Sequence, residues 1–84
     1  MTETVTPQDW TEHFAHCIQV LGGTTAASRR LGIDERAIRR FINGERPLGA
    51  GLLRDTAKTL RALIGEAKAA DDQITAILGP EPEA

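Results

Sequence analysis

Glycine-containing breaks divide the first half of this chain into short segments. Gly22-Gly23, Gly32 and Asn43-Gly44 each follow a stretch with apolar residues at helical spacing, and such residues favour the left-handed backbone that ends a helix. Isolated helices shorter than about 12 residues are marginal in water unless they pack on other parts of the chain. The sequence therefore predicts short helices joined by tight turns and stabilised by shared packing.

Length and composition limit what the chain can do. Its 84 residues, 40% hydrophobic and 4% aromatic, suffice for one small core and not for a multidomain enzyme. No run approaches the roughly 18 apolar residues of a membrane span, and residues 1–5 lack the basic and apolar blocks of a signal peptide. The single cysteine, Cys17, cannot form an internal disulfide. We expect a cytoplasmic protein without membrane contact, stabilised by packing or by oligomerisation.

Capping residues and periodicity predict the individual helices. A first helix over about residues 7–21 has Thr6 as its cap, a second is capped by Thr24 and ends at Gly32, and a third over residues 35–42 is capped by Asp34. The apolar stripe of the first helix is Trp10, Phe14, Cys17, Ile18 and Leu21. Residues 45–51 are expected to form a loop.

The C-terminal part is strongly helical from Leu52 to about Leu78, and Gly65 is a possible point of division. No stretch alternates apolar and polar residues as a half-buried strand does. We expect an all-α fold of about five helices. Its expected parts are a globular domain over residues 6–64, a C-terminal dimerisation helix over residues 65–78, and flexible ends over residues 1–5 and 79–84.

Charge is concentrated in the middle of the chain. The net charge is -2, yet residues 24–64 hold nine basic and four acidic residues. On the expected helix over residues 35–42, a basic face lies opposite the apolar side at i, i+3, i+4, i+7 spacing; it consists of Arg36, Arg39, Arg40 and Asn43. Arginine can donate two parallel hydrogen bonds to guanine or can bind phosphate. The same face can also be simply solvated, so spacing alone leaves both interpretations open.

The segment from Thr24 to Asn43 resembles the helix-turn-helix of the lambda Cro and repressor family. Gly32 stands at the turn, and small or apolar residues occupy the positions that join the two helices: Ala27, Leu31, Ile33, Ile38 and Phe41. Thr24 and Ser28 depart from the family, which often has glutamine and alanine at these positions. The whole chain resembles small plasmid-encoded repressors of the KorC type in its size and in two segments, Trp-Thr-Glu-His-Phe over residues 10–14 and Asp-Glu-Arg-Ala-Ile-Arg-Arg-Phe over residues 34–41.

This resemblance implies a lambda repressor-like fold and a DNA-binding transcriptional repressor. Residues 6–64 would be its helix-turn-helix DNA-binding domain, and the third helix would enter the major groove. It implies base contacts from Glu35, Arg36, Arg39 and Arg40. Phosphate contacts are expected from Thr24, Thr25, Asn43 and Arg46. The role of Glu35 stays open, because a carboxylate can accept a hydrogen bond from cytosine or simply favour the positive end of its helix.

A heptad-like apolar seam in the C-terminal half predicts a homodimer. The residues assigned to dimerisation are Leu60, Ile64, Ala67, Ile74 and Leu78. A two-fold dimer would place two recognition helices roughly 34 Å apart, so the double-stranded DNA operator should be an inverted repeat and its occupation would block a promoter. A second apolar stripe widens the seam; it consists of Leu52, Leu63, Ala70 and Ile77. We therefore expect one side to pack on the first three helices and another on the partner. The plain alternative is that the seam packs entirely within the chain.

Two further interpretations have weaker support. His13, His16 and Cys17 lie close together at a spacing compatible with metal ligation, but ordinary packing explains them better, and we assign no metal, cofactor or catalytic residue. The competing function is a protein-interaction module such as an antitoxin or adaptor. Such a module would more often present an exposed aromatic or aliphatic anchor than the three arginines of the basic face.

Overall fold

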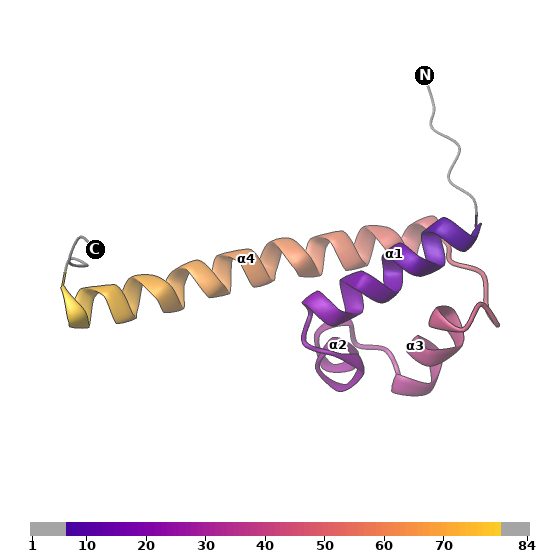
Figure 1. Ribbon diagram of the computed structural model, residues 1–84, viewed down its shortest axis with the longest axis horizontal. Helices are drawn as coiled ribbons and strands as arrows, with labels where there is room; N and C mark the ends of the chain where they lie inside the picture. Colours follow the sequence, from indigo (N-terminus) through magenta and orange to yellow (C-terminus); the bar gives the residue numbers. More distant parts are fainter. Residues whose placement is uncertain (1–6, 80–84) are drawn as a thin grey trace, which may run out of the picture.

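The fold is all-α, as the sequence predicts. A computed structural model describes residues 7–79, and these form α1 (Pro7–Val20), α2 (Thr24–Leu31), α3 (Glu35–Ile42) and α4 (Ala50–Leu78), with no strand among them (Figure 1). Thr6, the expected first cap, lies outside the described residues, as do residues 1–5 and 80–84 of the expected flexible ends. Within the described part of the chain, no helix is both long and apolar enough to cross a membrane.

The core lies where α1, α2 and α3 meet beneath the first half of α4. Its buried residues are Phe14, Ile18, Leu21, Ala27 and Ile38. The rings of Phe14 and Phe41 meet edge to face, with their centroids 6.0 Å apart. Trp10 and Cys17, which belong to the predicted stripe of α1, are only half-buried. The helical spacing therefore identifies the core side of α1 correctly but overestimates the depth of these two side chains.

The cap of α2 differs from the prediction. Gly23, with φ 97°, is the N-cap residue, and Thr24 is already the first residue of the helix. No side-chain hydrogen bond caps α2. The preceding turn is closed by the backbone, since the Gly23 N–H donates to the Ile18 carbonyl at 2.9 Å. Thr24 was wrongly assigned as the cap because glycine at this position can turn the chain without a side-chain oxygen.

The turn between α2 and α3 is closed by both backbone and side chain. Gly32 adopts the left-handed conformation with φ 73°, and its N–H donates to the Ser28 carbonyl at 2.9 Å. The Ser28 hydroxyl in turn donates to the Ile33 carbonyl at 2.5 Å. Asp34 then occupies the N-cap position of α3 in extended conformation, as predicted, although its side chain makes no capping hydrogen bond. Only three residues thus separate two short helices.

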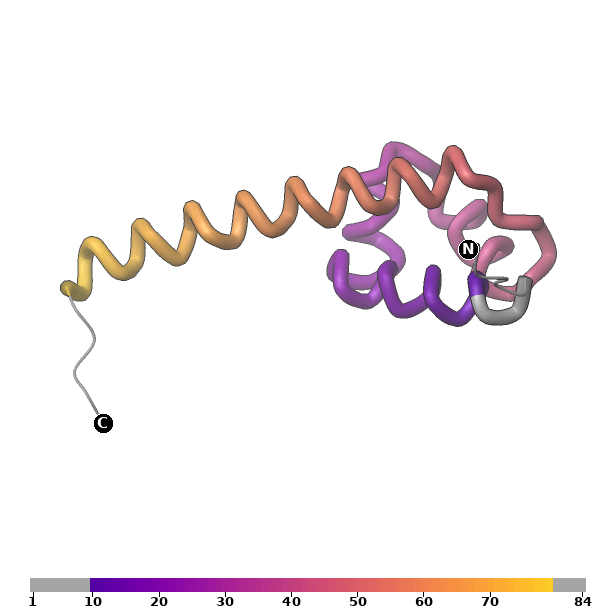
Figure 2. Tube along the Cα trace, turned by 90° about the horizontal axis from the view of Figure 1, so that it is seen from above, coloured from indigo at the N-terminus to yellow at the C-terminus, as the bar shows by residue number. Residues whose placement is uncertain are grey.

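The last helix is longer than expected and unbroken. α4 runs over 29 residues, about 43 Å, and Gly65 lies inside it without interrupting it. The described residues therefore form four helices rather than about five, and the expected boundary at residue 65 coincides with no break. A glycine costs a helix only about 1 kcal/mol relative to alanine, which good helix formers on both sides can offset. The second half of α4 extends beyond the other helices (Figures 1 and 2).

Candidate nucleic-acid interface

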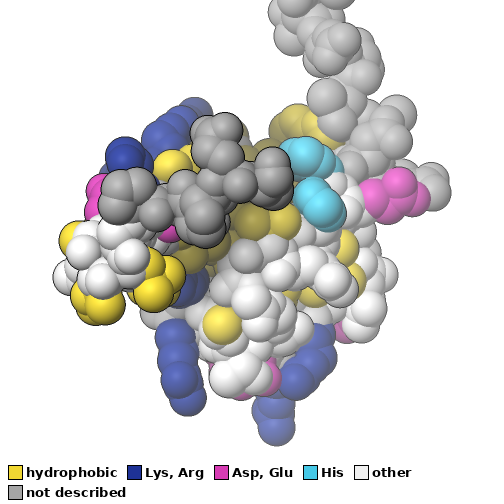
Figure 3. All heavy atoms as spheres, turned by 60° about the vertical axis from the view of Figure 1, so that its left-hand side comes forward, with side chains coloured by type: hydrophobic (Ala, Val, Ile, Leu, Met, Phe, Trp, Pro, Cys, Tyr) yellow, Lys and Arg dark blue, Asp and Glu magenta, His cyan; other side chains and the backbone are white. Residues whose placement is uncertain are grey.

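The third helix separates its apolar and basic sides completely. Ile38 is fully buried, and Ala37, Phe41 and Ile42 are partly buried on the same side. The basic face is exposed at every position: Arg36, Arg39, Arg40 and Asn43. Lys and Arg side chains project at the lower edge of Figure 3, the side on which α2 and α3 lie in Figure 1. The predicted division of α3 into core and basic faces is confirmed.

One arginine of the basic face is paired within its own helix. Nη2 of Arg39 donates to Oε1 of Glu35 at 3.1 Å, and the two side chains are 59% and 35% exposed. Arg36 and Arg40 form no ion pair with another described residue. The i, i+4 spacing signals this pair in the sequence, where Glu35 was considered only as a base contact or as a charge at the helix start. In the structure, Glu35 also holds Arg39.

The loop after α3 returns to the end of that helix and positions Arg46. The N–H groups of Glu45 and Arg46 both donate to the Arg40 carbonyl, at 2.8 and 3.3 Å. The Arg46 guanidinium lies over the Phe41 ring, 5.2 Å from its centroid. Nδ2 of Asn43 donates to Oε2 of Glu45 at 3.5 Å. Arg46 and Asn43, both predicted phosphate contacts, are therefore held at the C-terminal end of α3.

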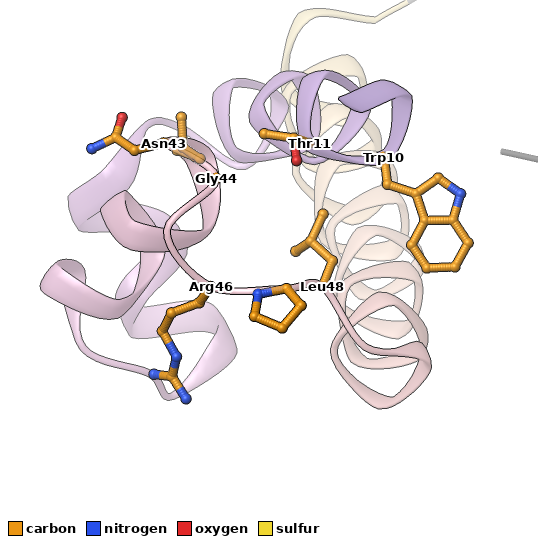
Figure 4. A pocket seen from close by; sticks show the side chains of 8 residues that line it. Trp10, Thr11, Asn43, Gly44, Arg46 and Leu48 are labelled. Atoms are coloured by element: carbon orange, nitrogen blue, oxygen red, sulfur yellow. The ribbon is translucent and has the colours of Figure 1, made fainter. Parts of the chain in front are cut away.

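An open hollow of about 580 Å³ lies between the start of α1 and this loop. Leu48 points into the hollow, whereas the side chains of Asn43 and Arg46 point away from it (Figure 4). The two polar side chains are both exposed. They are thus directed to the outer surface rather than toward a ligand in the hollow.

The other two predicted phosphate contacts lie on a different element. Thr24 and Thr25 are the first two residues of α2, where Thr24 is partly buried and Thr25 is exposed. A helix N-terminus carries unpaired N–H groups and a partial positive charge, which suit an anion. The proposed phosphate contacts therefore come from two places, the start of α2 and the loop after α3.

Two contacts that the sequence analysis missed brace the short helices. Ser28 is the first, through its hydrogen bond to the Ile33 carbonyl across the turn. The second joins α2 to α4, where Nη1 of Arg30 lies 3.1 Å from Oε1 of Glu66. Residues 36 positions apart give no local signal for such a pair. The first contact ties the end of α2 to the turn before α3, and the second links α2 to α4 at the surface.

The predicted dimerisation residues are mostly uncovered in the single chain. Leu60 is partly buried, whereas Ile64 is 68% exposed, Ile74 57% and Leu78 76%; Ala67 is also exposed. The interpretation in which the seam packs entirely within the chain is therefore wrong beyond Leu60. Its C-terminal half leaves large apolar side chains in water.

The candidate metal residues on α1 do not come together as a site. The rings of His13 and His16 lie with their centroids 6.5 Å apart. Burial raises the pKa of the Cys17 thiol, which disfavours the thiolate that binds metals. Among the described residues, no three His, Cys, Asp or Glu side chains are grouped so that they could hold a metal ion.

In comparisons with known proteins, no family model, no curated protein and no solved structure matches this chain. What the site can do follows from its geometry. It offers an exposed set of arginines on a helix narrow enough for a major groove, flanked by hydroxyl, amide and guanidinium groups suited to phosphates.

Proposed function

We propose that the chain is a sequence-specific, double-stranded DNA-binding transcriptional repressor of the lambda Cro and repressor family. The main support for this proposal is the basic face of α3, which is exposed along its whole length. On the opposite side of the same helix, Ile38 is fully buried in the core. The two short helices α2 and α3, joined by a tight glycine turn, fit a helix-turn-helix whose second helix reads the major groove.

The proposed contacts divide by function. Base edges are contacted by Arg36, Arg39 and Arg40 of α3. For Glu35, the fourth predicted base contact, the ion pair with Arg39 supports a second role, in which it holds that arginine and does not itself read a base. Phosphates are contacted by Thr24, Thr25, Asn43 and Arg46. The position of Arg46 on the Phe41 ring supports this division. A guanidinium held beside the end of α3 is well placed to contact a phosphate of the DNA backbone.

Dimerisation and repression complete the proposal. Exposed apolar side chains on one helix mark an association surface, and Ile64, Ile74 and Leu78 supply them. A homodimer would present two copies of α3 to an inverted repeat and would repress transcription by occupying promoter DNA. The same apolar surface favours one alternative, a protein-interaction module such as an antitoxin or adaptor that holds a different protein.

Selection of bound duplexes from a random pool tests the function. The winning duplex is then titrated against a scrambled duplex at two salt concentrations. We expect an enriched inverted repeat, preferred about 10³-fold over the scrambled duplex. No enrichment, with weak and strongly salt-dependent binding to both duplexes, would contradict the proposal and favour the interaction module.

Two arginine variants test the assigned roles. Arg39→Ala should lose about 1–3 kcal/mol on the selected duplex and little on the scrambled one, because a base contact acts only at its own sequence. Arg46→Ala should weaken both duplexes about equally and lower the salt slope by about one. Arg54→Ala on α4 is the control for loss of one positive charge. Equal losses for Arg39→Ala on both duplexes would contradict base reading by Arg39.

A further inference from the structure

An apolar groove lies between α1 and α4, on the part of the chain that carries the dimerisation seam. It encloses about 580 Å³. From α1 it is lined by Trp10, His13 and Cys17. From α4 it is lined by Leu53, Thr56, Ala57 and Leu60. Nothing in the described chain fills it.

The groove and the uncovered part of α4 belong to one continuous stripe. The stripe consists of Leu53, Ala57, Leu60, Ile64, Ala67, Asp71, Ile74 and Leu78, which fall within about 100° of one another on the helix. Its first part borders the groove, and its last part lies where α4 extends beyond the other helices (Figure 1). The halves from Leu53 to Ile64 and from Ala67 to Leu78 have equal lengths, each about 17 Å. One copy thus carries both a groove, which follows the stripe from Leu53 to Leu60, and an uncovered apolar segment that is long enough to fill it.

We propose that α4 pairs antiparallel with α4 of a second copy, so that the C-terminal half of each α4 fills the groove of the other. The register places Leu78 of the second copy opposite Leu53, Ile74 opposite Ala57, and Ala67 opposite Ile64. This pairing specifies the geometry of the proposed homodimer and rests on that part of the proposed function.

The charges of α4 favour the antiparallel direction. Residues 50–63 hold three basic side chains and one acidic one, whereas residues 64–78 hold one basic and three acidic ones. Antiparallel pairing places the basic half of each α4 beside the acidic half of the other, so the charges attract. Parallel pairing would place basic beside basic and acidic beside acidic, so the charges would repel. Arg61 and Asp72 border the stripe on the same side, so each approaches the other residue of the second copy.

Asp71 is the polar member of the stripe and argues against parallel, in-register pairing. Such a pair would place two Asp71 carboxylates face to face in the apolar seam, at the cost of desolvation and repulsion. In the antiparallel register Asp71 lies opposite Leu60 of the second copy, near the end of the groove. Its side chain already accepts a hydrogen bond from Thr75 Oγ1 at 3.4 Å.

The register also sets the spacing of the two DNA-binding units. In this register Leu53 of the second copy lies opposite Leu78, which is 25 residues from Leu53 along α4. The two Leu53 residues are therefore about 37 Å apart along the helix axis. The α1–α3 units are attached near these ends of α4 (Figure 2). One turn of DNA is about 34–36 Å, so the spacing suits adjacent half-sites on one side of the duplex.

Hydrodynamic mass tests whether the stripe holds the dimer. At micromolar concentration the unmodified chain should have a mass of about 18 kDa, twice the 9.1 kDa of one copy. Ile74→Asp should shift it to the monomer, because the charge falls in the seam. Ala76→Asp is the matched control, since Ala76 is exposed on the opposite side of α4 and should leave the dimer intact. A monomeric unmodified chain, or a dimer unchanged by Ile74→Asp, would overturn the proposal.

Disulfide trapping in a Cys17→Ser background tests the direction. The double variant Ala57→Cys, Ile74→Cys should form covalent dimers on mild oxidation, whereas each single variant should not. Trapping of the single variant Ile74→Cys would indicate parallel pairing and would overturn the register. A heterologous partner or an apolar ligand in the groove would appear as a chain that stays monomeric alone, which overturns pairing between copies.

Failure of the pairing and failure of the proposed function are distinguishable. If the register is correct, monomeric Ile74→Asp should still bind a single half-site weakly and should lose its preference for the inverted repeat. If the unmodified chain is dimeric but selects no DNA sequence, the DNA-binding proposal is wrong while the pairing stands.

Discussion

Replacing Glu35 by glutamine tests what a carboxylate does in the proposed DNA-reading face. Glu35 Oε1 lies 3.1 Å from Arg39 Nη2, and both side chains contact solvent. If Arg39 reaches a base, it must leave this partner. We expect Glu35→Gln to strengthen binding, because the variant removes both the competing partner and a negative charge near the phosphates.

The magnitude follows from the geometry of the pair. An exposed i, i+4 ion pair contributes about 0.3–0.5 kcal/mol, so its release raises DNA affinity about twofold. Direct reading of a base by Glu35 predicts the opposite sign, since loss of a good base contact costs about 1–3 kcal/mol, or about 5- to 150-fold. The direction of the change therefore separates the two roles.

Fluorescence anisotropy titrations of the selected and the scrambled duplex at one salt concentration measure the effect. Asp55→Asn on α4 is the control, because it removes one negative charge without breaking an ion pair among the described residues. It should strengthen binding less than Glu35→Gln does. A loss of more than about fivefold for Glu35→Gln on the selected duplex alone, which is the lower bound for a base contact, would refute the reasoning.

Three further predictions concern stability. Ile38→Ala should lower the free energy of unfolding by about 3 kcal/mol in urea, followed by circular dichroism, because it removes three fully buried carbons and leaves a cavity; a loss below about 1 kcal/mol would contradict the central position of Ile38. Ser28→Ala should cost about 1 kcal/mol in the same assay through loss of the hydrogen bond to Ile33, whereas Thr25→Ala at an exposed position should cost less. Burial raises the pKa of the Cys17 thiol. Between the ordinary thiol pKa and this raised pKa, the unfolded chain has lost a proton that the folded chain keeps, so the free energy of unfolding falls as pH rises through this interval. Melting temperatures of the unmodified chain and of Cys17→Ala, compared across this range, should diverge; parallel curves would contradict the shift.

The short helices were predictable because their signals are local. Gly32 and the pair Asn43-Gly44 follow the last residues of α2 and α3, so these two helices match the expected ranges. The continuity of α4 was not predictable in the same way. Whether Gly65 breaks a helix depends on a difference of about 1 kcal/mol between its own penalty and the propensities of its neighbours, which a sequence pattern does not resolve.

In the candidate site, too, helical periodicity predicts the features within one helix but not the contacts between distant residues. The exposed and buried sides of α3 follow from a rotation of about 100° per residue, which places Arg36 and Ile38 correctly. Periodicity does not predict the path of the loop that follows a helix or which distant helix the chain packs against next. The positions of Arg46 and of the Arg30–Glu66 pair depend on that path and packing and were found only in three dimensions.

Phe41 shows why core and site are not separable in a chain this small. One side of its ring meets Phe14 edge to face in the core, and Arg46 lies over the ring at the proposed phosphate-contacting surface. Leucine at this position would supply apolar volume for the core but no aromatic face for the guanidinium, a contact worth about 0.5–1 kcal/mol at an exposed site. The aromatic ring thus couples the packing of α3 to the placement of an arginine outside it. Helical periodicity assigns Phe41 to the core alone, and its second contact, with Arg46, is found only in three dimensions.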